Sequence, residues 1–148
     1  MKTYKIAIGC DHAGYCTKES VKKILEDLGH KVWDFGAHSE ESVDYPDFIH
    51  PLAKAVEEGD YNFGLIFCGS GNGVNIVANK YQGIRSALCW TEEVAKLARQ
   101  HNDANICAIP ARFIEIHLVK QIVKTFLETE FEGGRHARRV DKIPIQKK

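Results

Sequence analysis

The chain has 148 residues, of which 44% are hydrophobic and 27% are charged, a composition typical of one globular domain with a substantial core. Twenty basic residues balance twenty acidic ones, which argues against electrostatic attraction to nucleic acid or to an anionic membrane. No apolar run approaches the roughly 20 residues of a membrane-spanning helix, and the N-terminal segment has no signal-peptide core. We therefore expect a single cytoplasmic domain over residues 1–148, with no membrane or nucleic-acid partner.

Apolar runs of strand length alternate with longer segments of helical period, a pattern that is typical of βαβ units with a parallel sheet. Strands are predicted over residues 4–10, 31–35, 63–68, 85–90 and 105–109. Helices are predicted around residues 21–28, over 46–58, from about 74, after 91, and over about 113–128. The fold class is therefore α/β, with a five-stranded parallel, Rossmann-like sheet.

Local signals support several of these boundaries. Val21, Ile24, Leu25 and Leu28 have the i, i+3, i+4, i+7 spacing of a buried helical stripe, and this helix is expected to stop at Gly29. Thr91 is predicted to cap the next-to-last long helix, because acidic residues follow it in the first turn. In the final long helix, a stripe at residues 118, 122 and 126 is predicted to face the core.

The loop after the third strand is the most informative segment, because an apolar run leads directly into Cys68-Gly69-Ser70-Gly71-Asn72-Gly73. A helix N-terminus close to the strand end presents unpaired N–H groups that stabilise anions, whether a thiolate or a substrate oxyanion. Glycines without Cβ let a ligand approach the backbone amides. The loop is therefore a candidate catalytic loop, although a tight strand-to-helix turn is a comparable interpretation.

Two other polar segments accompany this loop. Asp11 and His12 follow the first strand, where they could orient one another or bind a hydroxylated ligand, although Asp11 could also simply cap a helix. His101 and Asn102 end the helix before the fifth strand, where a histidine also complements the helix dipole. In a doubly wound sheet functional residues gather at the carboxyl ends of strands, so we expect all three segments to meet over one crevice. The other histidines are interpreted as solvated.

The basic tail after Gly133-Gly134 contains Arg135 and Arg139 four residues apart, so the two guanidinium groups would share one face of a helix and could clamp a phosphate. Arg138 would point elsewhere, and a solvated tail is the alternative. Arg112 is a third candidate cation. The five cysteines are odd in number and lack CxxC spacing, so they are predicted to be free thiols.

Three familiar loop classes do not fit. A cysteine-dependent phosphatase loop requires an arginine six residues after its cysteine, but that position holds Cys16 for Cys10 and Val74 for Cys68. A phospho-receiver domain would end its third strand in an aspartate. A dinucleotide-binding domain would place its glycines after the first strand of a larger chain.

From end to end, the chain resembles the ribose-5-phosphate isomerase B and galactose-6-phosphate isomerase family. The resemblance is carried by the blocks at residues 9–14, 44–47, 68–73, 78–80, 83–85, 99–103 and 132–136. It implies a three-layer sandwich, a homodimer or homotetramer, and an aldose–ketose isomerisation of a phosphosugar without a metal or another cofactor. One branch of the family has a glutamate at the position of Val74, so this chain is similar to the cysteine branch.

The resemblance also implies roles for individual residues. Cys68 would move a proton between C2 and C1 through a cis-enediolate, while His101 would open the furanose ring and Ser70 would bind near the reacting carbons. The other implied ligands of substrate are Asp11, His12, Tyr45, Gly69, Gly71, Asn72, Gly73, Asn102, Arg112, Arg135 and Arg139, with residues 131–148 contributing to the site. Ribose 5-phosphate is the expected substrate. The alternatives are allose 6-phosphate, galactose 6-phosphate, a tetrose phosphate, or a binding module without catalysis.

Overall fold

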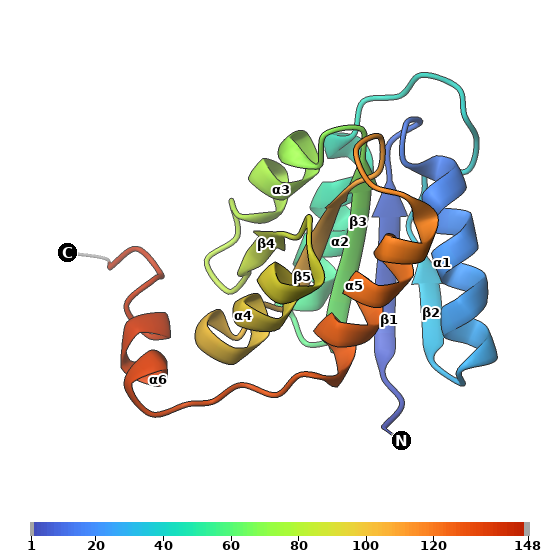
Figure 1. The fold of residues 1–148 in the computed structure, drawn as a ribbon. Coiled ribbons are helices and arrows are strands. Elements are labelled where there is room, and N and C mark those ends of the chain that lie inside the picture. Colours follow the sequence, from blue (N-terminus) through green and yellow to red (C-terminus); the bar gives the residue numbers. More distant parts are fainter. Residues whose placement is uncertain (1, 147–148) are drawn as a thin grey trace.

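A computed structural model describes residues 2–146 and contains one five-stranded sheet (Figure 1). The strands are β1 (Lys5–Cys10), β2 (Lys31–Asp34), β3 (Phe63–Cys68), β4 (Ser86–Leu88) and β5 (Ile106–Pro110). They lie in the order β2-β1-β3-β5-β4, and each neighbouring pair is parallel. The predicted parallel α/β sheet is confirmed.

Helices cover both faces of the sheet and produce three layers. The helices are α1 (Tyr15–Asp27), α2 (Pro46–Glu57), α3 (Asn72–Ala78), α4 (Glu92–Asn102), α5 (Ile116–Glu128) and α6 (Arg135–Val140). Apolar side chains of α1, α4 and α5 share one core cluster, and those of α2 and α3 share the cluster on the opposite face. The short α6 lies away from the sheet at the end of an extended segment (Figure 1).

The alternation of side chains along the central strands distributes them between the two cores. In β3, Leu65 and Phe67 belong to the cluster under α1, α4 and α5, whereas Ile66 and Cys68 belong to the cluster under α2 and α3. All six residues of β3 are buried, because both faces of this strand are covered. This placement puts the Cys68 side chain on the α2 and α3 face at the carboxyl end of the sheet.

Most predicted boundaries agree with the structure to within one or two residues. Thr91 caps α4, accepting a hydrogen bond from the N–H of Val94 at 3.1 Å. Two details were wrong. Leu28 is 44% exposed because α1 ends one residue earlier, and α5 begins at Ile116 because a turn follows β5, with the N–H of Phe113 bonded to Pro110 O.

The crevice of this topology lies between β1 and β3, because the chain leaves β1 toward β2 on one side and then crosses to β3 on the other. The carboxyl ends of these strands point to the top of Figure 1. Among residues 2–146, no helix combines the length and the apolar character needed to cross a membrane. Residues 147 and 148 of the predicted basic tail lie outside the described part of the chain.

Candidate active site

An open pocket of about 950 Å³ lies over the carboxyl ends of β1 and β3. It brings together eight of the residues predicted from the sequence, which are Asp11, His12, Tyr45, Cys68, Gly69, Ser70, Gly73 and Arg112. Val43, Asp44, Asp47 and Phe113 complete much of the wall; the sequence analysis did not assign them roles, although the two aspartates belong to a block that carries the family resemblance. The candidate catalytic loop therefore borders a cavity large enough for a sugar phosphate.

Cys68 places its sulfur at the wall of this pocket, with only 4% of the residue exposed. The backbone N–H of Gly71 donates a hydrogen bond to Cys68 Sγ at 3.0 Å. Gly71 has φ = 77°, and a Cβ there would lie 2.5 Å from Leu88 Cδ1, so both the backbone conformation and the space require glycine. The loop thus directs an amide at the sulfur, as predicted for a loop that supports a thiolate.

Gly73 and Tyr45 fit closely against one another. A Cβ at Gly73 would lie 2.6 Å from Tyr45 Cζ, so the missing side chain allows the tyrosine ring to approach the start of α3. Tyr45 precedes Pro46 at the N-terminus of α2 and reaches the pocket from the face opposite α1. In the same loop, Ser70 is exposed, and its Oγ accepts a hydrogen bond from the N–H of Asn72 at 3.2 Å.

Asp11 and His12 are held by backbone contacts on the β1 side of the crevice. The Asp11 carboxylate accepts a hydrogen bond from the N–H of Gly14 at 2.9 Å, so the structural role at the start of α1 is present together with exposure to the pocket. His12 Nδ1 accepts from the N–H of Val43 at 3.3 Å. A ring nitrogen that accepts carries no proton, so in the neutral ring Nε2 is the donor available to a ligand.

Arg112 lies at the β5 side of the pocket, where its backbone N–H bonds to Gly69 O at 3.1 Å. A Cβ at Gly69 would meet Arg112 Cδ at 3.1 Å, so the arginine side chain runs along the glycine loop. Among the described lining residues, Arg112 is the one arginine, and three aspartates, Asp11, Asp44 and Asp47, line the same pocket. This charge balance suits hydroxyl groups better than a phosphate dianion.

The other cysteines have different surroundings. Cys10 ends β1, but its side chain faces the α1 side, where its thiol donates to Ala37 O at 3.6 Å. Burial raises the pKa of Cys10 to about 12, although the nearby Lys18 charge opposes the shift. Cys89 and Cys107 are fully buried, and all five cysteines are free, as predicted. Of the two cysteines that end β1 and β3, only Cys68 lines the pocket.

His101, Asn102, Arg135 and Arg139 do not line this pocket, so the expectation that all three polar segments meet over one crevice is wrong within a single chain. His101 and Asn102 end α4 shortly before β5 begins at Ile106, which pairs with Gly64 near the start of β3. Cys68 pairs with Pro110 at the opposite end of the same two strands. The two segments are thus separated by about 13 Å of strand, the rise of four residues.

A second cluster forms where α4 meets α6. The rings of His101 and His136 stack with centroids 4.3 Å apart, and Glu132 Oε1 lies 3.6 Å from His101 Nε2. His136 was interpreted as solvated, but it is only 9% exposed, and burial together with the nearby His101 and Arg135 lowers its pKa. Arg135 and Arg139 share one exposed face of α6, as their spacing predicted.

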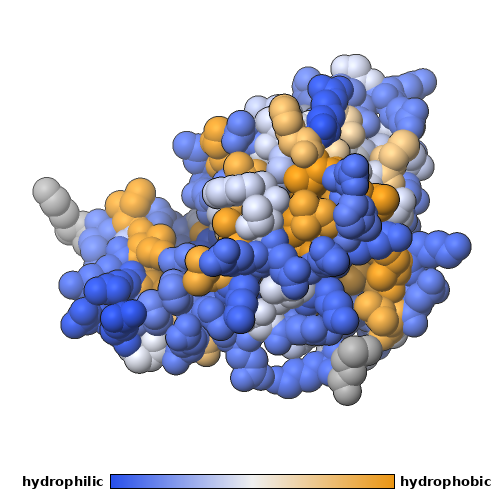
Figure 2. Space-filling model, in the orientation of Figure 1, coloured by the Kyte–Doolittle hydropathy of each residue, from blue (hydrophilic) through white to orange (hydrophobic). Residues whose placement is uncertain are grey.

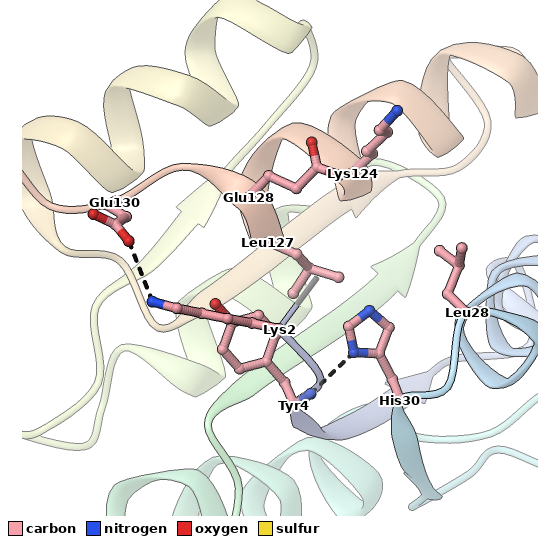
Figure 3. A pocket seen from close by; sticks show the side chains of 8 residues that line it. All are labelled: Lys2, Tyr4, Leu28, His30, Lys124, Leu127, Glu128 and Glu130. Carbon is pink, nitrogen blue, oxygen red and sulfur yellow. Dashed lines mark hydrogen bonds and ion pairs between the residues drawn. The ribbon is translucent and has the colours of Figure 1, made fainter.

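A separate cavity of about 160 Å³ lies at the amino ends of the strands (Figure 3). Leu28 and Leu127 contribute apolar walls, His30 Nδ1 accepts from the N–H of Tyr4 at 3.0 Å, and an ion pair of Lys2 with Glu130 lies at the edge. It contains none of the predicted site residues.

The fold and the pocket define an α/β protein with a candidate cysteine base at the crevice between β1 and β3. Residues 6–143 match the Ribose/Galactose Isomerase family, and the chain belongs to this family. Ribose-5-phosphate isomerase B of Escherichia coli is 42% identical, with 94% of this chain and 93% of that protein covered.

Solved structures agree with this assignment. A ribose 5-phosphate isomerase from Thermotoga maritima has a TM-score of 0.94 and 48% identity, with 97% of this chain and 99% of that chain covered. Ribose-5-phosphate isomerase B from Mycoplasma genitalium with bound ribulose-5-phosphate has a TM-score of 0.91 and 40% identity, with 94% and 93% covered.

Proposed function

We propose that this protein is an aldose–ketose isomerase that interconverts ribose 5-phosphate and ribulose 5-phosphate, with Cys68 as the base. The single observation that carries the mechanism is the sulfur of Cys68 at the wall of the sugar-sized pocket, with a backbone N–H 3.0 Å away. The substrate follows from the E. coli relative, named ribose-5-phosphate isomerase B, and from the M. genitalium structure with bound ribulose-5-phosphate. A non-catalytic sugar-binding module would have no need of this thiol.

In the forward direction, the Cys68 thiolate takes the proton from C2 of the open-chain aldose, and the electron pair forms the C1–C2 double bond of a cis-enediolate. The hydroxyl proton moves from the C2 oxygen to the C1 oxygen, and the thiol returns the proton it took to C1, so that the C2 oxygen becomes the carbonyl of the ketose. Negative charge collects on the substrate oxygens during the transfer, and donors that are already aligned stabilise this charge at little reorganisation cost. The amides of Gly69, Ser70 and Gly73 and the Ser70 hydroxyl are the candidate donors beside Cys68, because the amides of Gly71 and Asn72 already donate to Cys68 Sγ and Ser70 Oγ.

The remaining groups of the reaction come from a second copy of the chain in this proposal. The pocket holds three carboxylates and one arginine, whereas His101, Arg135 and Arg139 lie together at the α4 and α6 region of the same chain. A second copy that presents this region to the pocket would supply the ring-opening acid, Asn102 and a phosphate clamp. Two-fold pairing would then create two equivalent sites in a homodimer.

The projecting arm, which consists of α6 and the segments on either side of it (residues 129–146), has surface properties that suit such pairing. Ile143 and Ile145 on this arm are 51% and 78% exposed, and Phe113 beside the pocket is 75% exposed. Figure 2 shows apolar side chains at the surface of the projecting arm. Contact with a second copy would bury them and would also exclude water from the enediolate. We further propose a cytoplasmic location, in keeping with the free thiols.

The test is a coupled assay across ribose 5-phosphate, allose 6-phosphate, galactose 6-phosphate and a tetrose phosphate. Ribose 5-phosphate should give the highest kcat/KM. Cys68→Ala should lower kcat at least about 100-fold, because a positioned base contributes about 10²–10⁴-fold. The matched control is Cys10→Ala, which should retain most activity. A loss below tenfold in Cys68→Ala, or the reverse order of the two variants, would contradict the assignment of the base.

A further inference from the structure

His101, Glu132 and His136 form a compact set of metal-ligating side chains outside the pocket. Their ligand atoms all lie within 4.8 Å of one another, and within residues 2–146 they are the one group of three or more His, Cys, Asp or Glu residues so arranged. They come from three segments, the end of α4, the connection that follows α5, and the first turn of α6. The proposed reaction assigns no role to Glu132 or to His136.

The backbone holds this cluster together without a bound ion. The N–H of Glu132 bonds to Gln100 O at 3.1 Å, which fastens the connection to the last turn of α4. Gly133 and Gly134 then adopt φ = 67° and 57°, a left-handed turn that begins α6 and leads into the stacked ring of His136. The backbone segments that carry the three side chains are therefore close together before a ligand binds, a condition that favours affinity.

The donor set is the one that late transition metals prefer. Neutral imidazole nitrogen and carboxylate oxygen bind Zn²⁺ at about 2.0–2.2 Å, which places tetrahedral ligand atoms about 3.3 Å apart. His101 Nε2 and Glu132 Oε1 are already 3.6 Å apart, and their side chains are 40% and 48% exposed. The exposed His101 ring can therefore turn out of its parallel stack with His136, as it must for nitrogens of both rings to point at one ion. The positive charges of Arg135 and Arg139 on α6 oppose a cation, which lowers the expected affinity.

We propose that His101, Glu132 and His136 bind a late first-row transition metal ion, with Zn²⁺ the ion of interest, and leave a fourth coordination position for water. Through His101 this site is coupled to catalysis. A bound ion occupies the imidazole that the proposed function uses to open the sugar ring, and it therefore inhibits the isomerase reversibly. This second part depends on the proposed function, whereas the binding of the ion does not.

The binding test uses the chain without a histidine tag, titrated with Zn²⁺ by calorimetry and with Co²⁺ by visible absorption. One equivalent of Zn²⁺ should bind, Cu²⁺ should bind more tightly, Mn²⁺ more weakly, and Mg²⁺ should not compete. Glu132→Gln and His136→Gln should each weaken Zn²⁺ binding at least tenfold. Equal Zn²⁺ affinity in both variants and the original chain, or no binding at millimolar Zn²⁺, would overturn the site.

Two sets of control variants distinguish this cluster from other side chains of the protein that could bind a metal ion. His117 Nδ1 lies 3.2 Å from Glu115 Oε2, but among the described residues this pair belongs to no cluster of three metal-ligating side chains. His117→Gln should therefore leave Zn²⁺ affinity unchanged. Cys16→Ser and Cys68→Ala should also retain the binding, because the site contains no thiol. Loss of Zn²⁺ binding in either cysteine variant would assign the ion to a thiolate and would refute the proposal.

An activity measurement distinguishes failure of the metal site from failure of the proposed function. Zn²⁺ should inhibit turnover at the concentrations at which it binds, and a chelator should restore the rate. The concentration for half inhibition should rise at least tenfold in Glu132→Gln. A different result would be that Glu132→Gln weakens Zn²⁺ binding while Zn²⁺ has no effect on turnover. That result would support the metal site and contradict the role of His101 in catalysis.

Discussion

Cys68 and Cys10 show how much the chemistry of one residue type depends on its neighbours. They end adjacent parallel strands, and in the register of β1 and β3 Cys10 lies opposite Phe67, next to Cys68. The one-residue offset turns their side chains to opposite faces of the sheet. Cys10 is buried with a raised pKa, whereas Cys68 reaches the pocket and receives the N–H of Gly71. A thiol becomes a candidate base here through strand register rather than through sequence context alone.

At the same scale, the arginines of α6 provide a matched test of phosphate binding. Arg135 and Arg139 are one turn apart on α6, and Arg138 is a third exposed arginine of the same helix. Arg135→Ala should raise KM for ribose 5-phosphate at least about tenfold, since a charge-assisted hydrogen bond contributes about 1.5–3 kcal/mol. Steady-state kinetics with inorganic phosphate as a competitive inhibitor would measure the effect. Arg138→Ala is the control, and equal effects of the two substitutions would favour the solvated-tail interpretation.

Among the elements, α1 and β2 are joined by a buried ion pair. Lys18 is fully buried, and its ammonium group donates to both oxygens of Asp34, at 2.9 and 2.8 Å, and to Ala37 O at 2.6 Å. Burial by itself raises the pKa of Asp34, but hydrogen bonds from Lys18 and Gly36, together with the charges of Lys18 and Lys22, hold it below the usual range. These contacts connect α1 to the edge strand β2. The neighbouring strand β1 leads into Asp11 and His12.

This ion pair predicts a component of acid sensitivity. Because the pKa of Asp34 is lowered in the folded chain, its stabilising contribution is complete above the pKa of an unfolded aspartate, near about 3.9, and is lost as pH falls through the folded pKa. Urea unfolding between pH 3 and 7 should show this loss, and Asp34→Asn at neutral pH should lower the free energy of unfolding by about 3–5 kcal/mol. The exposed pair of Lys54 with Glu58 is the control, and Glu58→Gln should change stability by less than about 1 kcal/mol. An Asp34→Asn variant as stable as the original chain would contradict this account.

For the whole molecule, the arrangement predicts sites shared between two copies. Cys68→Ala and His101→Ala should each be inactive, but mixing them in equal amounts with subunit exchange should restore roughly a quarter of the original activity. Half of the molecules would be heterodimers, each with one intact site of two. Native mass spectrometry would verify the exchange. No recovered activity after verified exchange would mean that the two residues act within the same subunit.

The sequence alone determined the elements and identified the Cys68 loop as the candidate catalytic loop. Strand and helix periods are local properties, which is why most of the predicted boundaries agree with the structure to within one or two residues. Asp11, His12, Tyr45 and Arg112 were also identified from the sequence, and the structure places them around the same pocket.

The tertiary structure decided which of the predicted groups meet. The strand order β2-β1-β3-β5-β4 and the parallel register put Cys68 and His101 near opposite ends of the central strands, and no local pattern encodes that separation. The stacking of His136 on His101 likewise depends on the path of the chain between α5 and α6, where two glycines with positive φ turn the backbone. Pairing between distant segments is a property of the folded chain, because it arises from packing rather than from neighbouring residues.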